Sequence, residues 1–447
     1  MTPNKIFTLV LVIFIVLLSF KPNAQIIDVS AAAKELIADT ALTGSHIGIC
    51  IYDPTLNEYS YKYNSDKYFI PASNTKLFTT YVSLKFLGDS LDGIRYRETK
   101  DSIYIAPTGD PTLLVDDFNN QRVYNFLKNT KKHLLFEDIE SKMERLGLGW
   151  AWDDYNEDYM AERNTFPLYG NVFSIECKSA GKKRKNNELK MDPTIKNINI
   201  HFAKAVKEEE TIIKRGLASN DLEIIFNDKG GDVKQKIPFC TNGVETAIEL
   251  LKEKIPNLSF SYKKLMAEEI ASYKSLKSQP TDSVLRKMMH ESDNFFAEQL
   301  LLMSSSRKLG YMSDQIFIDS ILSHELKDLP QKPKWVDGSG LSRYNLFTPE
   351  SFVFLLNKMK NEFGLERLKN ILPTGGTGTL KKYFQSDSSY IFAKTGTLSN
   401  HSSLCGYLIT KKGKLLIFSL IANNYFSKAS SVRKSFEKFL KDLRNEN

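Results

Sequence analysis

Strand and helix patterns at both ends of this 447-residue chain enclose a long middle section of a different kind, and this arrangement constrains the fold most. Near the start, residues 46–52 and 59–63 are strand-like, and a turn-forming segment at residues 53–57 joins them. Residues 72–87 follow with a helical period that stops at Gly88. The front of the chain is therefore predicted to form a hairpin followed by a helix.

The back of the chain shows the same kinds of pattern. Helical periods return at residue 242 and recur, with interruptions, as far as residue 359. Residues 390–395, 405–410 and 415–422 are then strand-like, and a helical pattern over residues 429–443 ends the chain. We expect a mixed α/β (α+β) domain in which an antiparallel sheet, made from both ends of the chain, is flanked by helices.

The middle section, from about residue 94 to residue 239, has short apolar runs that alternate with polar loops. This texture predicts a β-rich insert. One of its loops, at residues 178–185, is strongly basic, which is typical of a solvated loop tip and would also suit contact with an anionic polymer.

The expected organisation is thus a split domain over residues 25–94 and 242–447, with an inserted β-rich domain over residues 95–241. The length agrees, because domains usually have about 100–200 residues.

The first 24 residues predict export. Lys5 precedes an uncharged run over residues 6–20, and the small residue Ala24 follows. A helix of this run spans only about 22 Å, less than the ~30 Å of a hydrocarbon core. A short apolar run between a basic start and a small residue is typical of a secretory signal peptide, here residues 1–24, and an uncleaved anchor is the alternative. We expect an exported protein of the periplasm or cell envelope, with peripheral association with the membrane or cell wall as a compatible state.

The charge and the pattern of histidines and cysteines limit the kinds of partner and cofactor that we expect. The net charge of +8 is scattered along the chain, so no nucleic-acid partner is expected. No metal-binding spacing of histidine and cysteine and no nucleotide-binding loop occurs, so neither a metal nor a cofactor is expected. The chain has four cysteines, Cys50, Cys177, Cys240 and Cys405. They could form two disulfides in any of three pairings, or remain free thiols.

Three short motifs carry candidate catalytic chemistry. In the first, Ser73 and Lys76 are three residues apart on the predicted helix, so their side chains share one face. A serine hydroxyl needs an adjacent base, and a lysine qualifies when burial or a second cation lowers its pKa. The same spacing recurs five times elsewhere in the chain, so this pair is not diagnostic by itself.

The second motif is Ser292-Asp293-Asn294, before an apolar helical pattern. The hydroxyl of Ser292 and the amide of Asn294 are suited to relay a proton and to hold a substrate carbonyl. Serine, aspartate and asparagine are also preferred at a helix N-cap, which is the simpler interpretation of this motif alone.

The third motif is the run from Lys394 through Thr395 and Gly396 to Thr397, at the end of a strand-like segment. Lys394 supplies a cation, and the two threonine hydroxyls are suited to bind a carboxylate. Gly396 lacks a side chain, so another backbone can lie beside the strand.

The order of the three motifs is more specific than any one of them. S-x-x-K on a helix, then S-D-N, then K-T-G on a strand is the set associated with penicillin-binding proteins and serine β-lactamases. The chain resembles most closely the D-alanyl-D-alanine carboxypeptidase/endopeptidases, the class C low-molecular-mass penicillin-binding proteins. The stretches that carry this resemblance are residues 71–77, 109–113, 149–154, 292–298, 337–343, 372–373 and 378–380.

The resemblance extends from about residue 26 to the C-terminus, and the 219 residues between Ser73 and Ser292 suit the large insert of that family. It implies the penicillin-binding or β-lactamase-like transpeptidase fold. The chain departs from the family at Thr377, where an acidic residue is usual, and its insert is short. Both differences concern the fit of the substrate and leave the catalytic groups unchanged.

The resemblance also implies roles for the motif residues. Ser73 would attack the penultimate D-Ala carbonyl of a peptidoglycan stem peptide while neutral Lys76 accepts its proton. Ser292 would relay a proton to the leaving amine, and Asn294 would hold Lys76 and the substrate amide. The substrate-binding residues would be Lys394, Thr395, Gly396 and Thr397.

By the same resemblance, β-lactam antibiotics would be covalent inhibitors that acylate Ser73. Two other functions stay open at this point. A β-lactamase or esterase on the same fold would deacylate rapidly, and a non-catalytic cell-wall-binding or β-lactam-sensing protein would bind muropeptides without releasing D-Ala. The balance between carboxypeptidase and endopeptidase action is not determined by the motifs, because one acyl-enzyme serves both.

Overall fold

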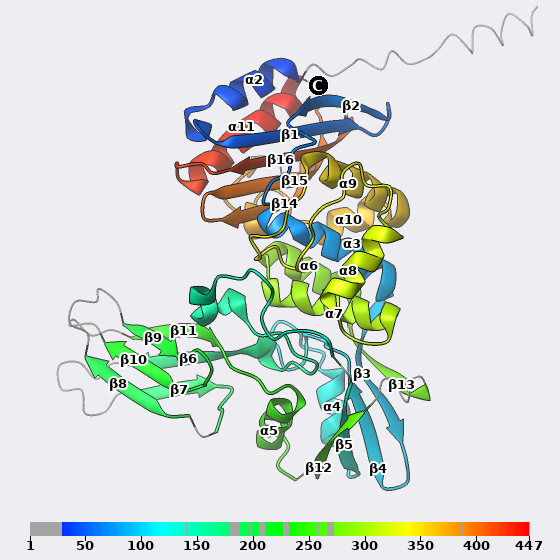
Figure 1. Ribbon diagram of the computed structural model, residues 1–447, viewed down its shortest axis with the longest axis vertical. Helices are drawn as coiled ribbons and strands as arrows, with labels where there is room; N and C mark the ends of the chain where they lie inside the picture. The colour runs from blue at the N-terminus through cyan, green and yellow to red at the C-terminus, as the bar shows by residue number, and fades with distance from the viewer. Residues whose placement is uncertain are drawn as a thin grey trace, which may run out of the picture.

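The computed structural model describes residues 29–446, except for residues 140, 179–187, 197, 205–210, 227–231, 258, 266–271 and 387. The signal peptide predicted at residues 1–24 and most of the basic loop at 178–185 lie outside the described residues. In Figure 1 the two ends of the chain meet in one lobe, and the middle of the chain forms a second lobe at the other end of the molecule. No helix in the described ranges is both long enough and apolar enough to cross a membrane.

The two chain ends build one antiparallel sheet of five strands in the order β14-β15-β16-β1-β2. This finding confirms the predicted mixed fold with a sheet made from both ends. The strands are β1 (His46–Asp53), β2 (Glu58–Tyr63), β14 (Ile391–Leu398), β15 (His401–Ile409) and β16 (Leu415–Asn423). The central strands are buried along almost their whole length, because helices cover both faces of the sheet.

One face of this sheet packs against the terminal helices α2 (Ser30–Ala38) and α11 (Ala429–Glu446), as Figure 1 shows. The other face packs against α9 (Pro349–Phe363), which lies in a layer of helices. The other helices of this layer are α3 (Lys76–Phe86), α6 (Thr281–Glu291), α7 (Asn294–Leu309), α8 (Asp314–Ser323) and α10 (Leu365–Ile371). Helix α3 is buried on all sides over its first nine residues, so the layer is built around it.

The middle of the chain forms a second, mixed sheet in the order β12-β5-β4-β3-β13. The pairs β4–β5 and β5–β12 are parallel, and the other two pairs are antiparallel. Its strands are β3 (Ser90–Glu98), β4 (Ser102–Pro107), β5 (His133–Ile139), β12 (Phe260–Leu265) and β13 (Lys274–Pro280). The helices α4 (Arg122–Asn129) and α5 (Val244–Lys254) pack against it.

Strand pairing places the end of the middle section later than expected. The expected boundary at residue 241 falls short, because β12 pairs with β5 and β13 pairs with β3, so the section continues to Pro280. The helical pattern that suggested a return to the first domain belongs to α5, whose apolar residues Val244, Ala247 and Leu251 join the core of the middle section. The front boundary at residues 94–95 falls inside β3 rather than before it.

Two three-stranded sheets form an arm beside the mixed sheet, at the left of Figure 1. One sheet contains β6 (Val172–Lys178), β7 (Glu188–Asp192) and β11 (Val233–Pro238), and the other contains β8 (Ile200–Lys204), β9 (Ile212–Arg215) and β10 (Leu222–Phe226). Short 3-10 turns complete the fold at Thr40–Leu42, Ala72–Thr75, Trp152–Asn156, Asp158–Met160, Tyr169–Asn171, Gly378–Leu380 and Ser388–Tyr390. All four cysteines are free thiols, so the structure contains neither of the disulfides that the sequence allowed.

Candidate active site

The first motif lies where the sheet meets the helical layer. Ser73 is on the 3-10 turn Ala72–Thr75, and Lys76 is the first residue of α3, so the pair spans the joint between turn and helix rather than one continuous helix. Their side chains still share a face, and 3.1 Å separates Lys76 Nζ from Ser73 Oγ.

Lys76 is fully buried, and its Nζ donates two further hydrogen bonds, to Asn294 Oδ1 at 2.6 Å and to the carbonyl oxygen of Ser339 at 2.7 Å. Both of these partners can only accept. A neutral amine has two N–H groups and one lone pair. If the two N–H groups serve these two acceptors, the lone pair is left for the hydroxyl of Ser73.

Burial also favours the neutral form of this amine. It lowers the pKa of Lys76 from 10.5 to about 8, because the charged form loses its hydration. The carboxylates of Asp337, Asp293 and Glu298 act in the opposite direction and raise the pKa. The balance leaves a lysine that can accept a proton close to neutral pH.

The second motif joins two helices beside Lys76. Ser292 ends α6 in the left-handed region, with φ of 60°, and Asn294 begins α7. Between them Asp293 caps α7 by accepting from the backbone N–H of Phe296 at 2.9 Å. The motif therefore combines both interpretations of the sequence: Asp293 makes the helix cap, while Ser292 and Asn294 contact the two buried lysines.

The third motif lies on β14, beside the first two. Lys394 is fully buried, and its Nζ donates to Ser292 Oγ at 2.8 Å and to the carbonyl oxygen of Thr395 at 2.7 Å. Burial, followed by the nearby cations Lys76 and Arg433, lowers the pKa of Lys394 well below its usual range. Unlike Lys76, this lysine has no carboxylate among the groups that shift its pKa, so an anion from outside would stabilise its charged form.

The end of β14 lies open to a ligand. Thr397 is exposed, and Arg433 on α11 donates a hydrogen bond to its hydroxyl. Thr395 precedes it on the same face of the strand and is buried.

Gly396 allows β14 to pass close to the turn that carries the nucleophile. A Cβ atom at this position would lie 2.5 Å from the carbonyl oxygen of Pro71, 2.2 Å from Ser403 Oγ and 3.1 Å from the backbone nitrogen of Ser73. The predicted close approach of another backbone is thus present, and that backbone is the turn of Ser73 itself.

Ser339, which accepts from Lys76, was not among the expected site residues. It lies in a buried loop wound around the carboxylate of Asp337, which accepts from the backbone N–H groups of Gly340 at 2.8 Å and Ser342 at 2.7 Å. The indole N–H of Trp150, from the middle section, donates to the same carboxylate at 3.0 Å. The stretches at residues 149–154 and 337–343, which include Trp150, Asp337 and Ser339, carried part of the family resemblance. The sequence therefore pointed to these residues, but it gave them no role.

Glu298 holds the same loop from the helical layer. It is fully buried on α7, and its Oε1 accepts from the backbone N–H of Ser339 at 2.7 Å. Its other oxygen lies 3.5 Å from the guanidinium of Arg163, which also pairs with Asp314. Burial and the neighbouring Asp337 raise the pKa of Glu298 to about 7, while Arg163 lowers it.

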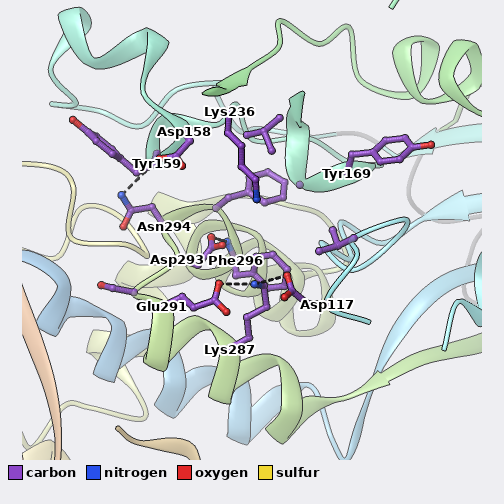
Figure 2. A pocket seen from close by; sticks show the side chains of 15 residues that line it. Asp117, Asp158, Tyr159, Tyr169, Lys236, Lys287, Glu291, Asp293, Asn294 and Phe296 are labelled. Atoms are coloured by element: carbon purple, nitrogen blue, oxygen red, sulfur yellow. Dashed lines mark hydrogen bonds and ion pairs between the residues drawn. The ribbon is translucent and has the colours of Figure 1, made fainter. Parts of the chain in front are cut away.

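Two cavities lie at these motifs. The first, of about 550 Å³, is lined by Ser73, Ser292, Asn294 and Thr397, so residues of all three motifs face one space. The second, of about 350 Å³, lies along Ser292 and Asn294 and is shown in Figure 2. Tyr159 lines both cavities, and its carbonyl oxygen accepts from the side-chain amide of Asn294 at 3.1 Å.

Comparison with known proteins identifies related carboxypeptidases. A model of the D-Ala-D-Ala carboxypeptidase 3 (S13) family matches residues 29–443. The chain is 24% identical to the D-alanyl-D-alanine carboxypeptidase DacB of Haemophilus influenzae, over 90% of this chain and 91% of that protein. It is 23% identical to a D-alanyl-D-alanine carboxypeptidase of Actinomadura sp., over 90% of this chain and 82% of that protein.

Solved structures show the same fold. Penicillin-binding protein 4 from Haemophilus influenzae matches with a TM-score of 0.74 at 21% identity, over 92% of this chain and 98% of that one. A predatory peptidoglycan endopeptidase from Bdellovibrio bacteriovorus matches with a TM-score of 0.51 at 15% identity, over 91% and 94% of the two chains. Because the family model covers nearly the whole described chain, this protein belongs to the D-Ala-D-Ala carboxypeptidase 3 (S13) family and is a serine-type hydrolase of that class, as its motifs predicted.

Proposed function

We propose that the protein is an exported peptidase that cleaves the D-Ala-D-Ala end of peptidoglycan stem peptides through an acyl-enzyme on Ser73. The observation that carries this proposal is the arrangement around Lys76 Nζ. Two acceptors can take up both N–H groups of the neutral amine, and the remaining position faces Ser73 Oγ at 3.1 Å. A lysine held in this way acts as a base toward that hydroxyl and toward no other group around it.

In the first step Ser73 Oγ attacks the penultimate D-Ala carbonyl, and its proton passes to Lys76. The backbone N–H groups of Ser73 and Thr397 form the oxyanion hole. The close pass of β14 at Gly396 supports this assignment, since it brings the strand to the Ser73 backbone. One such donor typically contributes on the order of 10²–10³ in rate.

In the next step the C–N bond breaks and the leaving amine takes a proton from Ser292. Ser292 is suited to this because it accepts from Lys394 at 2.8 Å, and Lys394 can replace the proton that Ser292 gives away. Water then attacks the acyl-enzyme. It supplies the hydroxyl of the released acid, its other proton passes through Ser292 to Lys394, and Ser73 regains its proton from Lys76.

The terminal carboxylate of the substrate binds at Lys394, Thr395 and Thr397. Two buried lysine amines lie near each other here, and Lys394 lacks an anionic partner among the groups that shift its pKa. The substrate carboxylate supplies that partner and stabilises the charged form of Lys394. The charged Lys394 in turn disfavours a second charge on Lys76, so a substrate with a free carboxylate helps to keep the base neutral.

β-Lactams combine a strained amide with a carboxylate, and we expect them to acylate Ser73. The related penicillin-binding protein 4 has been solved in complex with a novel β-lactam. The test is labelling with a fluorescent penicillin together with release of D-Ala from a pentapeptide. Wild type should do both, and Ser73→Ala should do neither. Labelling of Ser73→Ala at the wild-type level would refute the nucleophile, and rapid loss of the label without D-Ala release would favour a β-lactamase.

The predicted signal at residues 1–24 supports export to the cell envelope. Cell fractionation with N-terminal sequencing of the mature chain tests this. A mature N-terminus near residue 25 in the envelope fraction agrees with export, and an intact N-terminus in the cytoplasmic fraction contradicts it.

A further inference from the structure

The positive charge of the protein is concentrated near its C-terminus. Residues 381–446 contain twelve Lys and Arg residues against four Asp and Glu residues, a net charge of +8. This equals the net charge of the whole chain, so residues 1–380 are neutral overall. The charge, which we expected to be scattered, is therefore carried by the part of the chain that forms β14, β15, β16 and α11.

Helix α11 presents much of this charge to solvent. Its apolar residues face the sheet and are buried, while Lys434, Lys438 and Lys441 follow the opposite side at the spacing of one helix face. Two other segments add lysines beside the helix, at residues 381–382 and 411–414. We call this surface the basic face: the outer side of α11 together with residues 381–382 and 411–414.

Hydrogen bonds hold the two added segments against α11. After residues 381–382, the backbone N–H of Phe384 donates to Glu437 on the helix at 2.7 Å. At the other end of the helix, the backbone N–H of Lys411 donates to the carbonyl oxygen of Arg444 at 3.1 Å. The lysines of all three elements therefore belong to one continuous surface.

Only part of this charge is neutralised within the protein. Lys438 and Lys441 pair with carboxylates of α2 and α11. Lys381, Lys411 and Lys434 are exposed, and none of them makes an ion pair within the described ranges of the chain. The basic face therefore fits a partner that offers many negative charges over a wide surface.

An exposed aromatic ring beside the basic face favours a lipid surface over a dissolved polymer. Phe426, in the connection from β16 to α11, is 99% exposed. The hydroxyl of Ser427 donates to the carbonyl oxygen of Ala41 at 2.6 Å, which holds this connection against the turn that follows α2. A fixed aromatic ring next to lysines is the combination that binds at the boundary between lipid headgroups and acyl chains.

The position of α2 also brings this surface close to a membrane. Helix α2 packs beside α11, and only residues 21–28 separate the uncharged run at residues 6–20 from the start of the described structure. Eight residues span at most about 29 Å. A membrane that takes up the run during export therefore lies near the basic face. In Figure 1, α2 and α11 lie at the end of the molecule away from the middle section.

We propose that the basic face docks on an anionic phospholipid surface, with the ring of Phe426 entering the headgroup region. The lysines are attracted by the negative surface potential of the lipids, and the ring adds buried apolar surface. The middle section then points away from the membrane. This inference goes beyond the proposed peptidase activity and does not depend on it.

The test is sedimentation of the purified protein with vesicles of phosphatidylglycerol and phosphatidylcholine, and with vesicles of phosphatidylcholine alone. The protein is used without residues 1–24, so that the uncharged run cannot bind the vesicles, and it keeps every described element. Wild type should bind the anionic vesicles, lose this binding as salt is added, and leave the neutral vesicles unbound. Labelling by fluorescent penicillin in the same preparation reports that each variant is folded.

The main variant combines Lys381→Gln, Lys411→Gln and Lys434→Gln, one change in each element of the basic face. Each lysine near an anionic membrane contributes about fivefold to the affinity, so the triple variant should bind roughly 100-fold more weakly. Unchanged binding in the triple variant would overturn the docking surface.

A matched control makes the same change in net charge on the middle section. It combines Lys100→Gln, Lys131→Gln and Lys252→Gln, which replace three exposed lysines, and it should bind as wild type does. Equal loss in both triple variants would show that net charge alone attracts the protein, and would overturn a specific face.

The ring is tested at unchanged charge. Phe426→Ala should weaken binding to the anionic vesicles about tenfold, as expected for an apolar side chain that is no longer buried. Phe202→Ala, which removes another exposed ring from the arm, should have no effect. Equal binding by Phe426→Ala and wild type would overturn the entry of the ring.

The other partner class has its own outcome. Binding of wild type to purified peptidoglycan sacculi, without binding to anionic vesicles, would overturn the lipid surface. Release of D-Ala from a pentapeptide is measured separately, so either result leaves the proposed peptidase intact. Vesicle binding without any D-Ala release would support the docking surface and refute the peptidase.

Discussion

Ser339 and Lys76 meet through a 2.7 Å hydrogen bond from the lysine amine to a backbone carbonyl, although 263 residues separate them in the sequence. The peptide unit that carries this carbonyl is held from its other end, because the N–H of Gly340 donates to the buried carboxylate of Asp337. The preceding peptide N–H, of Ser339, donates to Glu298. Two buried carboxylates thus fix the position of the group that orients the base, and they also act on its charge.

The pH dependence of acylation should report Lys76. Its neutral form is the active base, so the acylation rate should rise with pH through about 8 and level off above that value. Stopped-flow kinetics with a fluorescent penicillin across pH 6–10 measure this profile. A rate that is still rising tenfold per pH unit at pH 10 would mean that burial does not lower the pKa of Lys76.

Glu298→Gln should move this acid limb to lower pH. The carboxylate of Glu298 raises the pKa of Lys76, against the effect of burial. Replacing this carboxylate with a neutral amide should therefore lower the pKa of Lys76. Glutamine keeps an oxygen that can accept from the backbone N–H of Ser339, so the position of the loop should persist. The measurement is the same pH profile.

Glu162→Gln is the matched control, because Glu162 is also a buried carboxylate but pairs with Arg145, away from Lys76. The control should leave the limb in place. A lower rate in Glu298→Gln with an unmoved limb would show that Glu298 only supports the fold.

Gly396→Ala should abolish most labelling by penicillin. The added Cβ meets the carbonyl oxygen of Pro71 and Ser403 Oγ, and backbone cannot give way as a flexible side chain can. Overpacking of this kind typically costs about 1–3 kcal/mol, so thermal stability should fall while the chain stays folded. The double variant Gly396→Ala with Ser403→Ala separates the two contacts. Recovery of labelling in the double variant would show that the serine hydroxyl, rather than the backbone, limits the space.

Arg433→Gln should weaken binding of substrates that carry a free carboxylate. Its guanidinium donates to Thr397 at the open end of β14, and it is one of the cations that act on Lys394. We expect about tenfold lower kcat/KM for a D-Ala-D-Ala peptide, the size of a typical hydrogen bond to a charged group. The same peptide as its C-terminal amide should be hydrolysed at nearly equal rates by the variant and the wild type.

Lys434→Gln provides the control for this change, since Lys434 is the exposed neighbour on α11. It should behave as wild type with both peptides. If Arg433→Gln lowers kcat/KM equally for the acid and for the amide, Arg433 does not contribute to recognition of the carboxylate.

Much of the fold could be predicted because its central strands and helices are strongly patterned. The strands β1 and β16 are buried and mostly apolar, and they were found to within one residue of their true limits. Only the second half of β15 was found, because the strand begins with the polar residues His401, Ser402 and Ser403. The strands β12 and β13 were missed because both lie at the edges of their sheet. Most residues of β13 are polar and half or fully exposed, so the strand carries no apolar pattern that a sequence could reveal.

The candidate site also contains residues that the sequence could predict and residues that it could not. Side chains with distinctive chemistry, such as Ser73, Lys76 and Lys394, can be recognised from residue type and order. Ser339 contributes a backbone carbonyl, which every residue type has, so nothing in its side chain predicts its contact with Lys76. The same holds for Trp150, whose role depends on an indole N–H that reaches Asp337 across 187 residues of sequence.

The pairing of β1 with β16 has a consequence for how the protein comes into being. His46 lies opposite Asn423, so β1, which is synthesised early, cannot pair with β16 until the ribosome has made nearly the whole chain. Contacts over such long stretches form slowly, and the nucleophile's turn rests on β14, which also arrives late. We infer that the chain gains no hydrolytic competence until nearly all of it has been synthesised, so a truncated chain should be inert toward any peptide that it meets.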